Sequence, residues 1–436
     1  MTSPATVPHK RWTYVIPVAV VMYMLAYLDR TNVSLILPFI GKELPLSASA
    51  TGLASGIFFI GYLVLQIPAA VLAVRWSARK TVLILMVAWS VAAVLCGLVH
   101  TEGQLYLARL LLGVFEGGVW PAVLVLLASW FPQAERARAN ALWMSCLPIS
   151  TILMSPLSGW MLDHMSWRWV FVLQGAPPLV WAVVWWFAVA DRPARARWIS
   201  DTERDYLEQT LAGEEAAKPK VAKQSYGQAL RNRSVLLLIL IYFCWITGFY
   251  GFTLWLPSVI KTMTGGSATL VGWLSAIPYL GALAGMVGTA LWSDRTGNRR
   301  LAVTLPLLLA IVALLAGNLL ALPSVPRFLL LCVVAIGVYA PYGPFWAVPS
   351  QLLRFEVVAV AMGVINALGN LGGFAGPYLV GWLTDATGSP TTGFVVLAGF
   401  LTVAAVLALV GLRGQPGGAA AALSGSGRAA TPHPGG

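Results

Sequence analysis

Long apolar stretches that recur along almost the whole chain constrain its fold more than any other feature. Each has about 20 residues, enough for an α-helix to cross the ~30 Å hydrocarbon core of a bilayer. Only 10% of the residues are charged, against about 25% in a typical soluble domain. A soluble fold is therefore excluded, and the sequence predicts an all-α integral membrane protein. Twelve stretches are predicted to span the membrane: 14–37, 51–74, 80–99, 104–130, 139–161, 169–190, 235–258, 270–292, 301–321, 327–350, 358–383 and 393–412.

Basic residues are distributed unequally between the two sides of this predicted membrane domain. With the N-terminus inside, 22 of the 28 Lys and Arg residues lie in cytoplasmic segments, four lie in outer loops, and Arg30 and Arg109 lie within the membrane. The positive-inside rule then predicts that both termini are cytoplasmic in a multi-pass protein of a bacterial-type cytoplasmic (inner) membrane. The formal charge of +12 follows from this topology, so no nucleic-acid partner is expected.

Cysteine and histidine give no sign of a disulfide framework or a metal centre. Cys96, Cys146, Cys244 and Cys332 lie in four different apolar stretches, which is typical of small buried residues. All four histidines lie outside the apolar stretches, so they cannot form an intramembrane metal site. The chain also has no G-x-x-x-x-G-K-[ST] phosphate loop. We expect no metal, no cofactor and no enzymatic activity.

A long hydrophilic segment divides six apolar stretches from six. We predict an N-terminal six-helix bundle at 1–190, a cytoplasmic linker with a short surface helix at 191–234, a C-terminal six-helix bundle at 235–413 and a disordered cytoplasmic tail at 414–436. Within the linker, Ser200 followed by Glu203 predicts a capping box at the start of the helix, and Gly213 predicts its end.

The two halves repeat each other. Matching residues are separated by 220 to 222 positions: Arg75 and Arg295, Pro156 and Pro377, Trp160 and Trp382, Asp163 and Asp385. This spacing predicts a duplicated six-helix unit. Both copies begin on the cytoplasmic side, so they are parallel repeats related by an axis along the membrane normal. Such an arrangement suits alternating access around a site between the halves.

Four ionisable residues lie deep inside the predicted membrane helices, and all are in the first half: Asp29, Arg30, Arg109 and Glu116. A charge at that depth costs at least ~2.5–3.5 kcal/mol, which makes such residues candidates for function. Asp29 and Arg30 are neighbours in sequence and point about 100° apart on a helix, so they cannot simply neutralise each other. The alternatives are an ion pair that locks two helices and, for Arg109, hydrogen bonds to carbonyl groups of an adjacent helix.

Helical spacing places these residues on particular faces. On the first helix, a polar stripe is formed by Tyr23, Tyr27, Arg30 and Ser34, while Asp29 and Asn32 face away from it. On the fourth helix, Gly113 and Gly117 form a small-x-x-x-small pair, which predicts close approach of another helix. The second half offers neutral polar candidates, which are Tyr342, Trp346, Asn366 and Asn370. We therefore expect charge recognition and ion coupling in the first half and closure over the substrate by the second.

Several stretches identify a family resemblance. The loop "SDRTGNRR" (293–300) is similar to the loop signature of the major facilitator superfamily, and "RLLLGVFEGG" resembles its R-x-x-x-G element. The first-half counterpart of that loop departs from the signature, with Val74 in place of Asp and Ser77 in place of Gly. The stretches "YLDRTNVS", "FYGFTLWLPSVIK" and "NALGNLGGFAGPYLVGW" resemble the anion:cation symporters, especially bacterial phthalate/tartrate-type permeases. The resemblance spans roughly 12–413 and implies two pseudo-symmetric six-helix bundles, the major facilitator fold.

The resemblance also implies roles for individual residues. Carboxylates matching Asp29 and Glu116 are proton-coupling in related sugar-acid carriers. The substrate-binding residues implied by the match are Arg30, Tyr27, Tyr62, Trp346 and Asn370; the gating or structural ones are Arg109, Asp294 and Arg295. Where relatives with hydroxylated substrates offer an amide, this chain has Leu147. That departure favours a less hydroxylated, even aromatic, carboxylate.

Together these features predict a proton-coupled secondary transporter, a symporter that imports a small organic carboxylate by alternating access. Its partners would be the organic anion, protons and the lipid bilayer, and it would function as a monomer. One alternative is an efflux antiporter of the same fold. Another is a transporter-like sensor that binds the anion, which the lack of an appended signalling domain disfavours.

Overall fold

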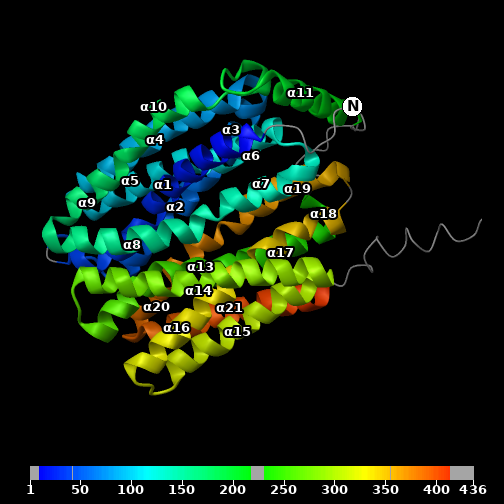
Figure 1. Ribbon diagram of the computed structural model, residues 1–436. Helices are drawn as coiled ribbons and strands as arrows, with labels where there is room; N and C mark the ends of the chain where they lie inside the picture. Colours follow the sequence, from blue (N-terminus) through cyan, green and yellow to red (C-terminus); the bar gives the residue numbers. More distant parts are fainter. Residues whose placement is uncertain (1–8, 42, 218–229, 354, 413–436) are drawn as a thin grey trace, which may run out of the picture.

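The computed structural model describes residues 9–41, 43–217, 230–353 and 355–412, and these residues form helices and short connections without a β-strand. Figure 1 shows two helical bundles lying side by side, one from each half of the chain. The predicted tail at 414–436 lies outside the described residues, as does the part of the linker at 218–229.

The first bundle contains ten α-helices and one π-helical turn: α1 (Lys10–Ile40), α2 (Ala48–Val64), α3 (Gln66–Leu72), η2 (Ala73–Ser77), α4 (Ala78–Gly97), α5 (Glu102–Gly117), α6 (Val119–Trp130), α7 (Gln133–Met144), α8 (Cys146–His164), α9 (Trp167–Gly175) and α10 (Pro177–Ala188). A short 3₁₀ turn, η3 (Pro193–Arg195), and α11 (Asp201–Ala217) follow it.

The second bundle is built in the same way, from α13 (Arg233–Thr264), α14 (Ala268–Thr296), α15 (Arg299–Leu319), α16 (Ser324–Tyr339), α17 (Tyr342–Ala347), α18 (Pro349–Leu352), α19 (Phe355–Gly369), α20 (Gly372–Thr387) and α21 (Pro390–Gly411). Several crossings consist of two helices in line, separated by one or two residues. The breaks fall at Gly118, before Pro177 and at Pro341, where a missing Cβ or a missing N–H weakens the helix.

Ten continuous helical segments in the described residues are long and apolar enough to cross a membrane. One of them, Ala48–Gly97, has 50 residues, about 75 Å of helix, and therefore contains two of the predicted crossings. The predicted crossing at 358–383 is divided between α19 and α20 and is not among the ten. The described helices are thus consistent with twelve crossings, and the predicted all-α membrane fold is confirmed.

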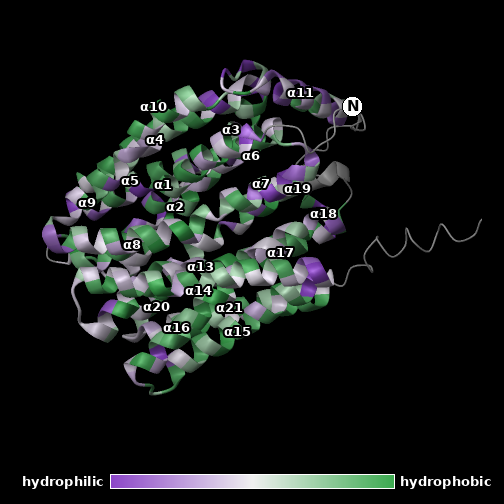
Figure 2. Ribbon diagram, in the orientation of Figure 1, coloured by the Kyte–Doolittle hydropathy of each residue, from purple (hydrophilic) through white to green (hydrophobic). Residues whose placement is uncertain are grey.

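The lateral surface of both bundles is apolar, as expected for helices that face lipid. Figure 2 shows hydrophobic residues along the helices and hydrophilic residues concentrated at the ends and on α11. Large apolar side chains stand exposed on these surfaces, for example Val180, Phe187 and Val312. In a soluble protein, so many exposed apolar side chains would promote aggregation. In a bilayer they face lipid chains that are equally apolar, so their exposure has no such cost.

The loop signature has different backbones in the two halves. In the second half, Gly297 ends α14 with φ +68°, a conformation that favours glycine. In the first half, Ser77 stands at the matching position with φ −169°, and its hydroxyl accepts the N–H of Lys80 to cap α4. Asp191, from beyond α10, accepts hydrogen bonds from the Ser77 hydroxyl (2.7 Å) and the Arg79 N–H (2.9 Å). A distant carboxylate thus caps this turn, beside the position where Val74 replaces the signature's acid.

The linker helix α11 is attached to the first bundle by ion pairs. Ser200 accepts the N–H of Glu203, as the capping box predicts. The Glu203 carboxylate, however, accepts hydrogen bonds from the Lys10 and Arg11 N–H groups at the start of α1, and its contact with the Arg11 guanidinium is 2.7 Å. The predicted helix end at Gly213 is wrong, because α11 continues to Ala217. One glycine costs only about 1 kcal/mol in a helix.

Glycines allow α2 and α5 to pack backbone to backbone. A Cβ at Gly113 would lie 1.9 Å from the Phe58 carbonyl oxygen, and one at Gly117 would lie 2.0 Å from that of Tyr62. The predicted close approach at this glycine pair is therefore confirmed, and its partner is α2. This contact brings the face of α5 that carries Glu116 against the helix that carries Tyr62.

We expect Gly113→Ala to destabilise the protein by about 1–3 kcal/mol, because the added methyl group must push α2 away from α5. Gly103→Ala is the matched control, since it lies on the same helix and its Cβ would have no neighbour within 4 Å. The measurement is thermal unfolding of both variants in detergent. Equal unfolding temperatures would show that the seam tolerates a side chain.

Candidate functional site

Arg30 lies on α1 at the boundary between the two bundles and is only 5% exposed. Its Nη2 lies 3.3 Å from Glu116 Oε2 on α5, and its Nη1 lies 3.4 Å from the Tyr250 hydroxyl on α13. Its guanidinium also stands over the ring of Tyr62, 4.8 Å from the centroid. Arg30 therefore contacts both bundles, and its ion pair with Glu116 is longer than the 2.7–2.9 Å of a strong charge-assisted bond.

The two buried carboxyl groups have incomplete hydrogen bonding. Glu116 is fully buried and, although no fixed partner was evident from the sequence, it pairs with Arg30 through one oxygen, while Oε1 has no partner. Both carboxyl oxygens of Asp29 also lack a partner, and so does the Trp89 indole N–H that faces them. A buried polar group without a partner is costly. Such groups in a native fold call for an explanation.

Arg109 contacts the backbone beside these residues. Its guanidinium donates to the main-chain carbonyl groups of Asp29 (2.9 Å) and Arg30 (3.1 Å) on α1. It also lies 3.4 Å from the Ala54 carbonyl on α2. These contacts correspond to the alternative in which Arg109 hydrogen-bonds carbonyls of adjacent helices. Arg109 therefore holds α1, α2 and α5 together at the level of the charged residues.

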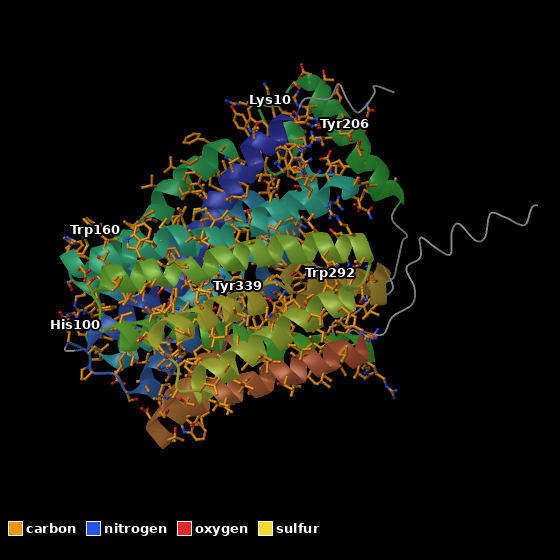
Figure 3. The ribbon with its side chains drawn as sticks, turned by 60° about the horizontal axis from the view of Figure 1, so that its bottom comes forward. Lys10, His100, Trp160, Tyr206, Trp292 and Tyr339 are labelled. Carbon is orange, nitrogen blue, oxygen red and sulfur yellow. The ribbon has the colours of Figure 1, made fainter. Side chains whose placement is uncertain are left out.

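Tyrosines complete the site on the second bundle's side. The Tyr27 hydroxyl lies 3.1 Å from that of Tyr339 on α16, which joins the two bundles through a pair of phenols. Tyr339 lies near the middle of the molecule in Figure 3, between the end that carries His100 and Trp160 and the end that carries Lys10. The site is thus close to mid-membrane depth and on the boundary between the bundles.

Asn370 and Trp346 lie toward the predicted cytoplasmic side of this centre. Asn370 donates to the Asn366 side chain (3.0 Å), and Asn366 donates to Gln66 of the first bundle (3.2 Å). Trp346 stands against Trp120 of the first bundle, with ring centroids 6.0 Å apart. Neither residue is among the partners of Arg30. The structure therefore places the predicted second-half ligands around the inner part of the interface.

Two of the predicted gating residues lie in the last turn of α14, its predicted cytoplasmic end. Asp294 is exposed and pairs with Arg299 of the same loop at 2.6 Å, and Arg295 is exposed as well. These contacts stay within the second bundle. In the described part of the chain, hydrogen bonds between the bundles are concentrated instead at the centre and the outer end.

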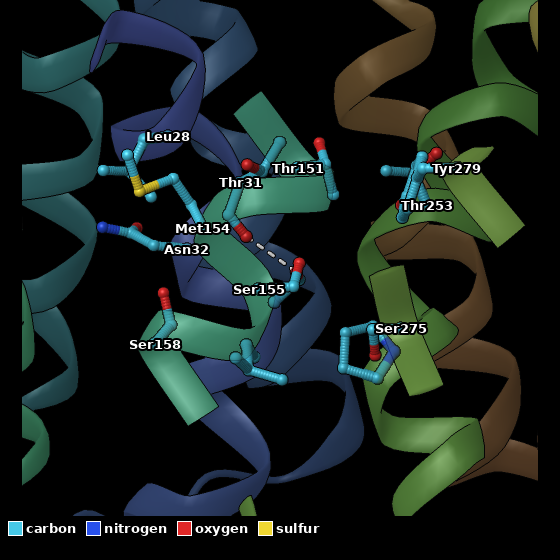
Figure 4. A pocket seen from close by; sticks show the side chains of 13 residues that line it. Leu28, Thr31, Asn32, Thr151, Met154, Ser155, Ser158, Thr253, Ser275 and Tyr279 are labelled. Carbon is cyan, nitrogen blue, oxygen red and sulfur yellow. Dashed lines mark hydrogen bonds between the residues drawn. The ribbon is translucent and has the colours of Figure 1, made fainter. Parts of the chain in front are cut away.

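A polar pocket extends from the centre toward the predicted outer side, between the bundles. Its cavity volume is about 20 Å³, which is room for one or two water molecules. Figure 4 shows its walls: α1 and α8 on one side, and Thr253, Ser275 and Tyr279 of the second bundle on the other. The buried oxygens of Asn32, Thr253 and Ser275 have no hydrogen-bond partner. The pocket has enough polar partners to hold ordered water.

Sequence reasoning missed three residues of this constellation, and each had a signal. Tyr250 lies 220 residues after Arg30, which is the repeat spacing, so the duplication itself points to it. Tyr339 precedes the candidate Tyr342 by one helical turn. Gln66 is an amide within an apolar stretch. Applying the repeat spacing to every buried charge would have found the first of them.

Comparison with known proteins agrees with this arrangement. The chain matches the Major Facilitator Superfamily over residues 19–265 and 258–432. A protein of Agrobacterium vitis named "Putative tartrate transporter" is 36% identical over 409 residues, 92% of this chain and 94% of that protein. A protein of Acinetobacter baumannii named "Quinolone resistance transporter" is 31% identical over 389 residues, 88% of this chain and 89% of that protein.

A solved structure shares the fold. It is a bacterial homologue of the human lysosomal transporter Spinster, 20% identical, with a TM-score of 0.73 over 93% of this chain and 98% of that one. The sequence match covers both halves of the chain and the structural match covers both bundles. The protein is therefore a membrane transporter of the major facilitator superfamily, similar to anion-type permeases, and not an enzyme.

Proposed function

We propose that the protein is a proton-coupled symporter that imports a small organic carboxylate across a cytoplasmic (inner) membrane, with both termini cytoplasmic, and that it works as a monomer. The observation that carries the proposal is the buried Arg30, whose only charged hydrogen-bond partner among the described residues is one oxygen of Glu116. Two relatives named "Putative tartrate transporter" support an organic acid as the substrate class.

The geometry suits an exchange of partners at Arg30. A substrate carboxylate can bind a guanidinium through two parallel hydrogen bonds to two oxygens, which is stronger than the two long contacts (3.3 and 3.4 Å) that converge on the single oxygen Glu116 Oε2. When the anion takes Arg30, Glu116 loses its counter-ion in a buried site. A buried carboxylate that loses its cation is stabilised by taking up a proton. Anion and proton would then be loaded together.

Asp29 supplies the second proton position. Its carboxyl group lies close to Trp89 and Arg109, and its oxygens have no hydrogen-bond partner of normal geometry. Glu116 is the other carboxyl group near it. A proton that binds Glu116 removes a negative charge beside Asp29. The two protonation events would therefore be coupled. Each net positive charge carried inward adds about 2.3 kcal/mol per 100 mV of membrane potential.

Export is the second candidate, and one observation favours it. The relative from Acinetobacter baumannii is named for quinolone resistance, which is a property of exporters. The same buried charges could serve an antiporter, with proton entry driving release. Direction is decided by measuring whether an imposed inward pH gradient accumulates tartrate in proteoliposomes or expels a fluoroquinolone from them. Counterflow in the same vesicles separates a carrier from an anion sensor.

We expect Arg30→Lys to weaken anion binding about 10- to 100-fold, because an ammonium group cannot form the two parallel hydrogen bonds of a guanidinium. The protein should still insert and fold. The measurement is titration of the purified variant with tartrate and related acids. Arg168→Lys is the matched control, since Arg168 forms an ion pair with Glu43 at the outer surface. Unchanged affinity in the Arg30 variant would remove Arg30 from the site.

We expect Asp29→Asn and Glu116→Gln to abolish accumulation driven by a pH gradient, because neither amide can carry the proton. At least one of the two variants should still bind the anion or exchange it by counterflow. Asp201→Asn, on the exposed surface of α11, is the control for loss of an acidic residue. If both site variants still concentrate substrate against its gradient, the proton-coupling role is wrong and a structural ion pair replaces it.

A further inference from the structure

Asp163 and Asp385, which the sequence repeat pairs, lie at the outer ends of α8 and α20 and each contacts the opposite bundle. Asp163 accepts hydrogen bonds from the N–H groups of Ala268 (3.0 Å) and Thr269 (2.8 Å) at the start of α14. Asp385 accepts them from Ala48 (3.1 Å) and Ser49 (2.7 Å) at the start of α2. Each carboxylate therefore caps a helix that belongs to the other half of the molecule.

The first four N–H groups of each helix are satisfied in the same way, two by a serine and two by the aspartate. At α14, Ser267 accepts the N–H of Leu270 through its hydroxyl and that of Val271 through its carbonyl. At α2, Ser47 does the same for Ala50 and Thr51. The first two N–H groups of each helix are left for the aspartate. A helix start has four unsatisfied N–H groups and a partial positive charge, so a carboxylate is a favourable partner there.

Directly below each aspartate, the helices are in backbone contact. A Cβ at Gly159 on α8 would lie 2.3 Å from the Ala268 carbonyl oxygen, and a Cβ at Gly381 on α20 would lie 2.1 Å from that of Ala48. The pairs α8–α14 and α2–α20 have the most extensive contacts of any helix pairs that cross between the bundles. Figure 1 shows α8 and α14 running side by side along the boundary.

We infer that Asp163 and Asp385 are paired latches that hold the outer ends of the two bundles together, and that both must release before the pocket opens to the outer side. The polar pocket lies immediately below: Ser275 follows Thr269 by six residues on α14, about 9 Å along the helix. Alternating access requires the bundles to separate at this end. Separation must break these two charge-assisted caps and the hydrogen bond that Lys261 of α13 donates to the Pro38 carbonyl of α1. The aspartates are the paired members of this set, and the seam beneath them is made of glycines and backbone.

The test uses a reporter cysteine in the pocket, Ser275→Cys, and a membrane-impermeant maleimide applied to the face on which Thr101→Cys, an exposed outer-loop residue, reacts. Adding Asp163→Asn or Asp385→Asn should raise the labelling rate at position 275 about fivefold each, because a neutral acceptor roughly halves the strength of a charge-assisted bond. The double variant should exceed both. Glu102→Gln is the matched control, since Glu102 lies at an outer helix start but bonds Tyr106 of its own helix.

Native Cys96 distinguishes release of a latch from loosening of the fold. It is fully buried in the outer half of the first bundle, so it should stay unlabelled in every variant. Unchanged labelling at position 275 in either aspartate variant would overturn the paired latch. Labelling of Cys96 together with position 275 would overturn it as well, because the bundle itself would then have opened.

Discussion

A guanidinium buried between two bundles of apolar helices is the constraint on which the rest of the site depends. Arg30 is only 5% exposed, so its hydrogen-bond partners must come mainly from the protein or from a bound anion. In this structure, Glu116 and Tyr250 provide long contacts on two sides, and aromatic rings cover its faces. The arrangement stabilises the charge without saturating it. Under the proposed function, this partial pairing is what allows Arg30 to bind the substrate carboxylate, because a fully paired arginine would have no free donors.

The neighbouring helices are held in place so that this partial pairing persists. Arg109 fixes the carbonyl groups of α1 next to Arg30, and the glycine seam brings α5 against α2. Without Cβ atoms at Gly113 and Gly117, backbone contact replaces side-chain packing, and Glu116 comes within reach of α1. Small residues are the usual means of close approach in membranes, where burial of apolar surface does not drive helices together.

Duplication explains why the centre and the outer end are organised differently. At the outer end, the two halves keep the same residues, so Asp163 and Asp385 make equivalent contacts with opposite helices. At the centre the halves have diverged: Arg30 meets Tyr250, the residue one repeat spacing further along the chain. A symmetric device suits a contact that must open on both sides at once. An asymmetric one suits recognition of a single anion, because two guanidinium groups at the axis would repel each other.

The sequence alone determined the membrane fold and the division into two six-helix units. It also identified the residues whose burial in the membrane costs the most free energy. Apolar length, repeat spacing and charge inside the membrane each have a direct energetic meaning that needs no coordinates. It also indicated Asp29, Arg30 and Glu116, because a buried charge is conspicuous wherever it lies. Only the tertiary structure decided which carboxyl group pairs with Arg30, that Arg109 binds carbonyls, that α11 extends past Gly213, and that Asp163 and Asp385 reach across the interface. These are contacts between helices far apart in the chain. Their existence depends on crossing angles and on backbone approach, and periodicity within a single helix carries no information about either.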